Sequence, residues 1–288
     1  RSSATTITTN ITALVIAARL LAKMSDEVAE LVLEDNRLQS LALSVSEAGG
    51  ASFLPGVVRT IELLEASGRL DRRVEGLASS DVLLRRGLDG RGLTRPEFAV
   101  VLSMAKMALQ DAIESNSPAD DRLLEPQLFA AFPKPMQKAH ADAIRSHRLR
   151  HEILATKIAN RIVNRLGPSI PINLSEEEGV SLGQVATAFL VAEQILGLPS
   201  LWKRIEEAEI PEALRIELLQ IAARSVRGHV SDILRSTGAE SNVSELCERL
   251  GPGVKEVAAA AARLIKSEIR NEAAAPPEHL IGLGQDKV

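Results

Sequence analysis

The sequence has little cysteine, few aromatic residues and no long hydrophobic run. Its single cysteine, Cys247, excludes an intrachain disulfide and is typical of a reducing compartment. Aromatic residues make up 2% of the 288 residues and tyrosine is absent, so Leu, Ile, Val and Ala must fill the core. The apolar segment 11–22 contains Arg19 and is shorter than the roughly 20 residues of a membrane span. We therefore expect a cytoplasmic protein with no membrane partner.

The net charge argues against a nucleic-acid-binding protein, and the residue pattern argues against a fold built from strands. A formal net charge of −4 lacks the basic excess of nucleic-acid-binding proteins, so we expect no nucleic acid partner. Ala- and Leu-rich sequence without a clear alternating pattern favours helices over strands. We predict an all-α fold, an irregular multi-helix bundle around a long central helix. Because the chain begins Arg-Ser-Ser rather than with Met, we also expect it to be a piece of a longer polypeptide.

Residues 145–168 predict the helix around which the bundle is built. They contain no Gly or Pro before Gly167 and Pro168, where a helix would end. One side carries apolar residues at helical spacing: Leu154, Ala155, Ile158, Ala159, Ile162 and Leu166. A second side mixes apolar and polar residues: Leu149, Ile153, Val163, Thr156, Asn160 and Asn164. Two such sides indicate neighbours on both, and an unbroken helix over 136–166 would be about 46 Å long.

Capping signals mark other helices. Thr94 with Glu97, and Ser181 with Gln184, form capping boxes that begin helices ending near residue 115 and at Gly197. Further helices are predicted over 10–23, 25–44, 55–67, 122–132, 211–238 and 242–250, and an Ala-rich one to about residue 275. The helix over 25–44, with Ser25 as its N-cap, is expected to bury five residues: Val28, Leu31, Val32, Leu38 and Leu41.

The chain is expected to divide into three parts. Residues 1–75 are predicted to form a helical lead-in, residues 76–240 a helical core and residues 241–288 a helical tail whose end is partly disordered. The glycine- and arginine-rich stretch 69–92 is the expected flexible joint.

Two groups of residues could carry chemistry, and a structural role is favoured for both. His147 and His151 have a spacing that can bind zinc, but Arg148 and Arg150 flank them and would repel a cation. A basic strip could grip phosphates, yet it lacks interleaved aromatic residues, so pairing with acidic side chains is favoured. The strip consists of Arg150, Lys157, Arg161 and Arg165. Cys247 is interpreted as a packed residue rather than a nucleophile.

The polar row Thr156, Asn160 and Asn164 has two interpretations. It could contact a ligand or a catalytic domain, or it could form a polar network that sets how two helices pack, which we favour. We take one candidate interaction face from this helix: Arg150, Thr156, Asn160, Arg161 and Asn164. We identify no catalytic, cofactor-binding or metal-binding residue.

Several segments resemble one enzyme family in their amino-acid sequence and in their order along the chain. They are MSDEVAELVLEDN (24–36), GRGLTRPE (90–97), FPKP (132–135), HRLR through ANRIVNR (147–165) and GLPSLW (197–202). Together they resemble the large bacterial NAD-specific glutamate dehydrogenases, over roughly residues 24 to 235. In that family the segments lie in a helical C-terminal part that follows the catalytic region.

The resemblance implies an accessory role in a parent enzyme. That parent would oxidatively deaminate L-glutamate to 2-oxoglutarate and ammonium with NAD bound in upstream segments, so we expect this chain to be inactive alone and to hold no cofactor. It would serve assembly or regulation, with the catalytic domain of the same polypeptide as its partner, in a homo-oligomer. The alternative is a free-standing helical protein-interaction module.

Overall fold

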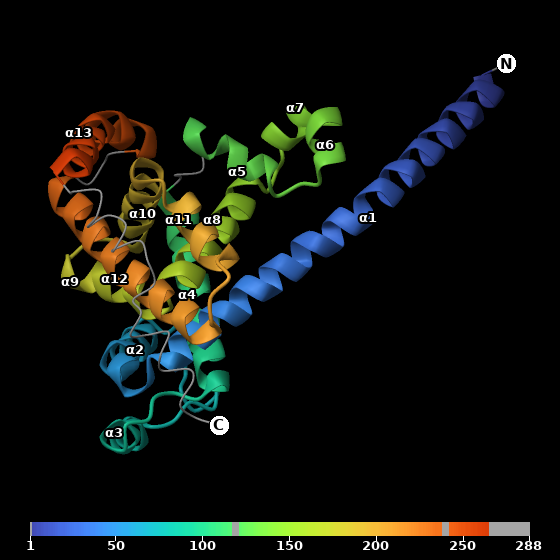
Figure 1. The fold of residues 1–288 in the computed structure, drawn as a ribbon. Helices are drawn as coiled ribbons and strands as arrows, with labels where there is room; N and C mark the ends of the chain where they lie inside the picture. Colours follow the sequence, from blue (N-terminus) through green and yellow to red (C-terminus); the bar gives the residue numbers. More distant parts are fainter. Residues whose placement is uncertain (1, 117–120, 238–241, 265–288) are drawn as a thin grey trace.

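The computed structural model describes residues 2–116, 121–237 and 242–264, which form helices without any strand (Figure 1). The predicted all-α class is confirmed. The helices are α1 (Ser2–Ala48), α2 (Gly50–Ala66), α3 (Ser80–Leu88), α4 (Arg95–Asn116), η2 (Arg122–Leu124), α5 (Glu125–Phe129), α6 (Lys134–Ala139), α7 (Ala141–Arg145), α8 (Arg150–Leu166), α9 (Ser169–Glu177), α10 (Leu182–Leu196), α11 (Leu198–Glu207), α12 (Glu212–Ser236) and α13 (Val243–Leu264).

The core lies around α4, α8 and α10. α8 packs along α4 and also contacts α1, α5, α9, α10 and α12, which confirms its central place. All six residues of its predicted apolar side are buried: Leu154, Ala155, Ile158, Ala159, Ile162 and Leu166. The predicted core face of α4 is buried as well: Phe98, Val101, Leu102, Ala105, Leu109 and Ile113. Each fully buried Leu, Ile or Phe contributes about 1.5–3 kcal/mol, so the packing of α8 on α4 is a substantial part of the stability of the fold.

The second side of α8 is only partly buried. Val163 is buried and Ile153 is half-buried against the core, as predicted. The prediction is wrong for Leu149, which is 45% exposed, and for Thr156, which is exposed. Leu149 lies before the first turn of the helix, in the turn after α7, and so it is not held against a neighbour.

The single helix predicted over 136–166 is wrong. The chain forms three helices there, α6, α7 and α8, with a break at His140, whose backbone has φ −132° and ψ 34°. The sequence has no helix-breaking residue at this point, and tertiary contacts hold the turns instead. Ile144 of α7 is buried, and the Phe132 ring meets the His147 imidazole edge-on at 5.7 Å between centroids. Packing therefore overrides helix propensity here.

α1 replaces the two helices predicted over 10–23 and 25–44. The Ser25 hydroxyl donates to the Ala22 carbonyl oxygen instead of capping a new helix. Since the segment contains no Gly or Pro before Gly49, nothing interrupts a helix of 47 residues. Figure 1 shows its N-terminal part extending away from the other helices.

The burial predicted for α1 is also wrong in its middle. Val28, Leu31 and Val32 are 42%, 38% and 54% exposed, whereas Leu38 and Leu41 are half-buried. The helix is buried against the bundle toward its C-terminal end, at Ala42 and Ser46, and it also touches α6, where the Lys134 backbone N–H donates to Glu27 at 3.0 Å.

Local capping signals predicted helix starts correctly. Ser181 and Gln184 form a complete capping box at the start of α10, and Gly197 ends that helix with φ 65° in the left-handed region. Before α4, the Glu97 carboxylate accepts hydrogen bonds of 2.8 Å from the Thr94 backbone N–H and hydroxyl. Both helices therefore begin where their capping residues stand.

α13 continues beyond the residues at which the sequence predicted that a helix would end. The helix predicted over 242–250 was to end at Gly251–Pro252–Gly253, yet α13 continues to Leu264. Gly251 is buried, and a Cβ there would lie 3.8 Å from the Ile195 side chain of α10, so the close packing of these helices sustains α13 past the proline. The predicted continuation to about residue 275 and the expected disordered end fall largely on 265–288, outside the described residues.

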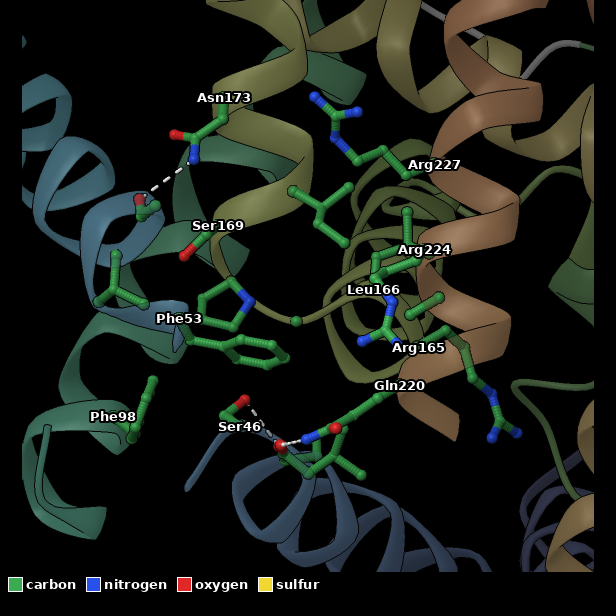
Figure 2. A pocket seen from close by; sticks show the side chains of 18 of the residues that line it. Ser46, Phe53, Phe98, Arg165, Leu166, Ser169, Asn173, Gln220, Arg224 and Arg227 are labelled. Carbon is green, nitrogen blue, oxygen red and sulfur yellow. Dashed lines mark hydrogen bonds between the residues drawn. The ribbon is translucent and has the colours of Figure 1, made fainter. Parts of the chain in front are cut away.

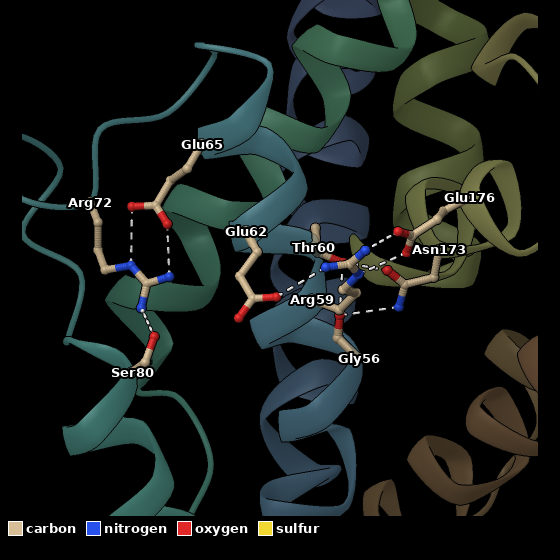
Figure 3. Close-up of polar contacts among 9 residues, drawn as sticks. All are labelled: Gly56, Arg59, Thr60, Glu62, Glu65, Arg72, Ser80, Asn173 and Glu176. Carbon is tan, nitrogen blue, oxygen red and sulfur yellow. Dashed lines mark hydrogen bonds and ion pairs between the residues drawn. The ribbon is translucent and has the colours of Figure 1, made fainter.

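Polar contacts join α2 to α9 (Figure 3). The buried Thr60 hydroxyl donates to the Gly56 carbonyl at 2.9 Å and lies 3.2 Å from Asn173 Oδ1. The Asn173 amide donates to the same Gly56 carbonyl at 3.1 Å. Outside this cluster, Arg59 Nε donates to Glu176 at 2.8 Å. The half-buried Gly56 carbonyl accepts both of these side-chain hydrogen bonds, and the one from Asn173 joins α9 to α2.

Buried residues from Ala42 to Leu246 form one hydrophobic cluster. The division at residues 75 and 240 stays a prediction. Among the described residues, no single helix has both the length and the apolar content to cross a membrane, although two sharply bent helix pairs meet that test by length and composition alone.

Candidate functional site

The polar side of α8 forms a charged cluster with α1, α10 and α11. Its central contact joins Arg161 of α8 to Glu193 of α10, with Nε and Oε1 3.2 Å apart but without hydrogen-bond geometry at Nε. Arg161 also donates to Gln127 at 2.6 Å. Burial lowers the pKa of the Arg161 guanidinium and raises the pKa of the Glu193 carboxyl. The pair is thus desolvated, and each charge depends on the other.

A second set of ion pairs lies beside the first. Glu206 of α11 accepts from Arg165 of α8 and from Arg37 of α1, the latter at 2.6 Å. Arg37 also donates to Glu34 at 2.7 Å, and these bonds raise the pKa of Arg37 and lower that of Glu34. The Arg165 guanidinium stacks over the Trp202 ring at 5.3 Å from its centroid. This network ties α1 and α11 to the central helix.

The charged cluster encloses a pocket of about 560 Å³. Four basic and four acidic residues line it: Arg37, Arg161, Arg165, Lys203, Glu34, Glu193, Glu206 and Glu207. Each of them has an ion-pair partner among the others. Because the charges balance within the cluster, we interpret it as a structural ion-pair network.

The structure separates the five residues of the predicted interaction face. Arg161 lies in the charged cluster, and Asn164 lies one turn further on, where it lines a different pocket. Arg150 lies in the first turn of α8, at the opposite end of the helix. The Thr156 hydroxyl donates to the Glu152 carbonyl of its own helix and points to water, and Asn160 is half-buried. The favoured network joining the polar row is not seen among the described hydrogen bonds.

Residues that complete the cluster come from distant parts of the chain. Glu193 and Glu206 pair with arginines of α8, and Arg37 of α1 pairs with Glu206. Because these residues lie on other helices, no local spacing could have identified them. The expectation that the basic strip pairs with acidic side chains is confirmed for Arg161 and Arg165.

The described residues include no group of three or more His, Cys, Asp or Glu side chains arranged to hold a metal ion. His147 instead accepts a hydrogen bond at Nδ1 from the Leu149 backbone N–H at 3.1 Å, which supports the structural role. Cys247 packs against the core, and burial raises the pKa of its thiol, which lowers its reactivity as a nucleophile.

α1 presents an exposed apolar stripe, which we define as Leu14, Leu21, Val28 and Val32. These side chains are 72%, 65%, 42% and 54% exposed. Their spacing of seven, seven and four residues places them on one side of the helix. Large apolar side chains grouped on one face indicate an interaction surface. The sequence predicted burial for Val28 and Val32, whereas it made no burial prediction for Leu14 and Leu21.

Comparisons with known proteins converge on one family. The family model for "Glutamate dehydrogenase, C-terminal" matches residues 90–287. An NAD-specific glutamate dehydrogenase of Pseudomonas aeruginosa is 33% identical over 237 residues, covering 82% of this chain and 15% of the relative. Proteins with the same description from Halomonas elongata and Mycobacterium tuberculosis are each 33% identical over 73% and 68% of this chain. The chain spans only 13% and 12% of their lengths.

Proposed function

The chain belongs to the NAD-specific glutamate dehydrogenase family, and from this premise we propose that it is a helical accessory region of such an enzyme. It is inactive alone and holds no cofactor. The parent polypeptide oxidises L-glutamate to 2-oxoglutarate and ammonium with NAD, in the cytoplasm, through residues outside this chain. The accessory region binds the catalytic part of the same polypeptide and supports its assembly or regulation within a homo-oligomer.

The observation that carries the proposal is the apolar stripe of α1. Covering these four large apolar side chains with a partner would contribute a free energy of roughly 25 cal/mol for each Å² of apolar surface removed from water. The N-terminal part of α1 stands away from the body of this chain (Figure 1), and all four stripe side chains keep 42–72% of their surface exposed. The heptad-like spacing suits packing against another helix.

The length of the relatives supports the catalytic part of the same polypeptide as the partner that covers the apolar stripe. Relatives described as NAD-specific glutamate dehydrogenases are more than six times as long as the segment they share with this chain, since that segment is 15% or less of their length. The charged pocket of this chain is neutralised by its own ion pairs. Substrate and nucleotide chemistry is therefore assigned to the rest of the polypeptide.

The test uses the full-length parent polypeptide with Leu21→Glu and Val32→Glu combined. We expect the double variant to lose assembly, measured by sedimentation, together with glutamate-dependent NAD reduction, because two carboxylates cannot be buried in an apolar contact. The matched control is Val74→Glu with Leu88→Glu, at positions that are 77% and 82% exposed. Unchanged assembly and activity in the α1 double variant would overturn the docking role.

The reading frame of the gene that encodes this chain distinguishes the accessory role from the alternative, a free-standing interaction module. A nucleotide-binding βαβ region encoded in frame upstream supports the accessory role. A start codon near residue 1 supports the free-standing module.

A further inference from the structure

A second pocket, of about 230 Å³, lies where α1, α2, α9 and α12 meet beside the end of α8. Phe53 and Leu166 supply apolar walls. Ser169 of α9 and Arg224 of α12 also line the pocket, from different sides (Figure 2). The pocket thus combines apolar surface with polar groups from separate helices, which is the usual composition of a small-molecule site.

The charges around this pocket have one sign. Its lining includes no acidic side chain, but it includes Arg165, Arg224 and Arg227. Arg165 pairs with Glu206 and Arg227 with Glu177, both outside the lining. Arg224 is exposed at the rim of the pocket, and it makes no ion pair or hydrogen bond with any residue that the structure describes. One guanidinium at the pocket therefore keeps all its donors available, in a fork that matches a carboxylate.

Two buried polar atoms at the pocket also lack partners. Asn164 Oδ1 and Ser169 Oγ are buried, and neither makes a hydrogen bond within the described part of the chain. Both residues line the pocket. Because native proteins satisfy nearly all buried polar atoms, two such atoms beside an unpaired guanidinium indicate that something else bonds to them.

We propose that this pocket binds a small organic carboxylate. The carboxylate pairs with Arg224 and accepts a hydrogen bond from the Ser169 hydroxyl, while the apolar part of the ligand lies against Phe53 and Leu166. A hydroxyl or amino group on the ligand donates to Asn164 Oδ1. The site rests on the geometry of this chain alone and stands whether or not the accessory role is correct.

The test is calorimetric titration of the 288-residue chain with hexanoate, with its neutral amide hexanamide and with inorganic phosphate. We expect saturable binding of hexanoate and none of hexanamide, because the amide removes the charge while keeping the apolar tail. Arg224→Gln should weaken hexanoate binding about tenfold, the effect of losing one charged hydrogen-bonded contact. The matched control, Arg204→Gln, changes an exposed arginine of α11 outside this pocket and should leave binding unchanged.

A second variant introduces a negative charge at nearly constant shape. Asn164→Asp should abolish hexanoate binding, while circular dichroism shows that the helices are retained. The proposal is overturned if hexanoate does not bind, if hexanamide binds equally well, or if binding survives both Arg224→Gln and Asn164→Asp. Phosphate binding through Arg224 that is tighter than hexanoate binding would also overturn it, since the apolar walls would then have no role.

Discussion

At the scale of single residues, burial shifts the pKa of Lys106 and so makes the stability of the fold depend on pH. Lys106 lies half-buried on α4, and desolvation lowers its pKa to about 8, against a weaker opposing effect of Asp35. Its ammonium lies 3.4 Å from the Gln39 side-chain oxygen. The folded state therefore penalises the charged lysine, and this penalty links stability to pH.

Replacing Lys106 by Met should raise the free energy of unfolding at pH 7. A lysine whose folded pKa is depressed destabilises the fold fully below pH 8, where it is charged in both states. The penalty is relieved as pH rises through the folded pKa, so the advantage of Lys106→Met should shrink from pH 8 toward pH 10. Urea unfolding at a series of pH values measures this. The exposed Lys255→Met serves as control, and an advantage that grows above pH 8 would contradict the assignment.

The pair formed by Arg161 and Glu193 should behave as one unit. Arg161→Met leaves the Glu193 carboxylate buried without its counter-charge, which costs about 3 kcal/mol. Adding Glu193→Met to the first change should recover much of that loss, because no charge then remains buried. Denaturant unfolding of the two single variants and the double variant gives the coupling energy. Additive losses would show that the two side chains do not depend on each other.

At the scale of elements, the contact of α2 with α9 rests on a few polar atoms (Figure 3). Asn173→Ala removes one of the two side-chain donors to the Gly56 carbonyl and the oxygen near the buried Thr60 hydroxyl. We expect a loss of about 2 kcal/mol in unfolding free energy. Asn36→Ala, at an exposed position of α1, is the control. Equal effects of the two changes would mean that the contact adds nothing to stability.

Elements with local signals could be predicted from the sequence, and elements shaped by packing could not. The capping residues before α4 and α10 act within one turn, so their spacing is sufficient. The break at His140 and the passage of α13 through Pro252 depend on contacts with distant helices. The candidate site follows the same rule, because Arg161 and Asn164 were identified on α8 whereas Glu193, on another helix, was not.

At the scale of the whole molecule, α1 and the helical bundle differ in how far their apolar residues are buried. The bundle buries its apolar residues in a single cluster and neutralises its central charges with its own ion pairs. α1 leaves the bundle and carries its apolar stripe into solvent (Figure 1). This arrangement supports the proposal that the bundle carries α1 as a surface for contact with another body.

The most direct measurement is NAD reduction by the purified 288-residue chain with L-glutamate. We predict no NADH formation above background, in a sample whose circular dichroism shows the helical content of the structure. The full-length parent polypeptide, assayed alongside, should reduce NAD. Glutamate-dependent turnover by the isolated chain would contradict the account, because it would place the dehydrogenase chemistry within these helices.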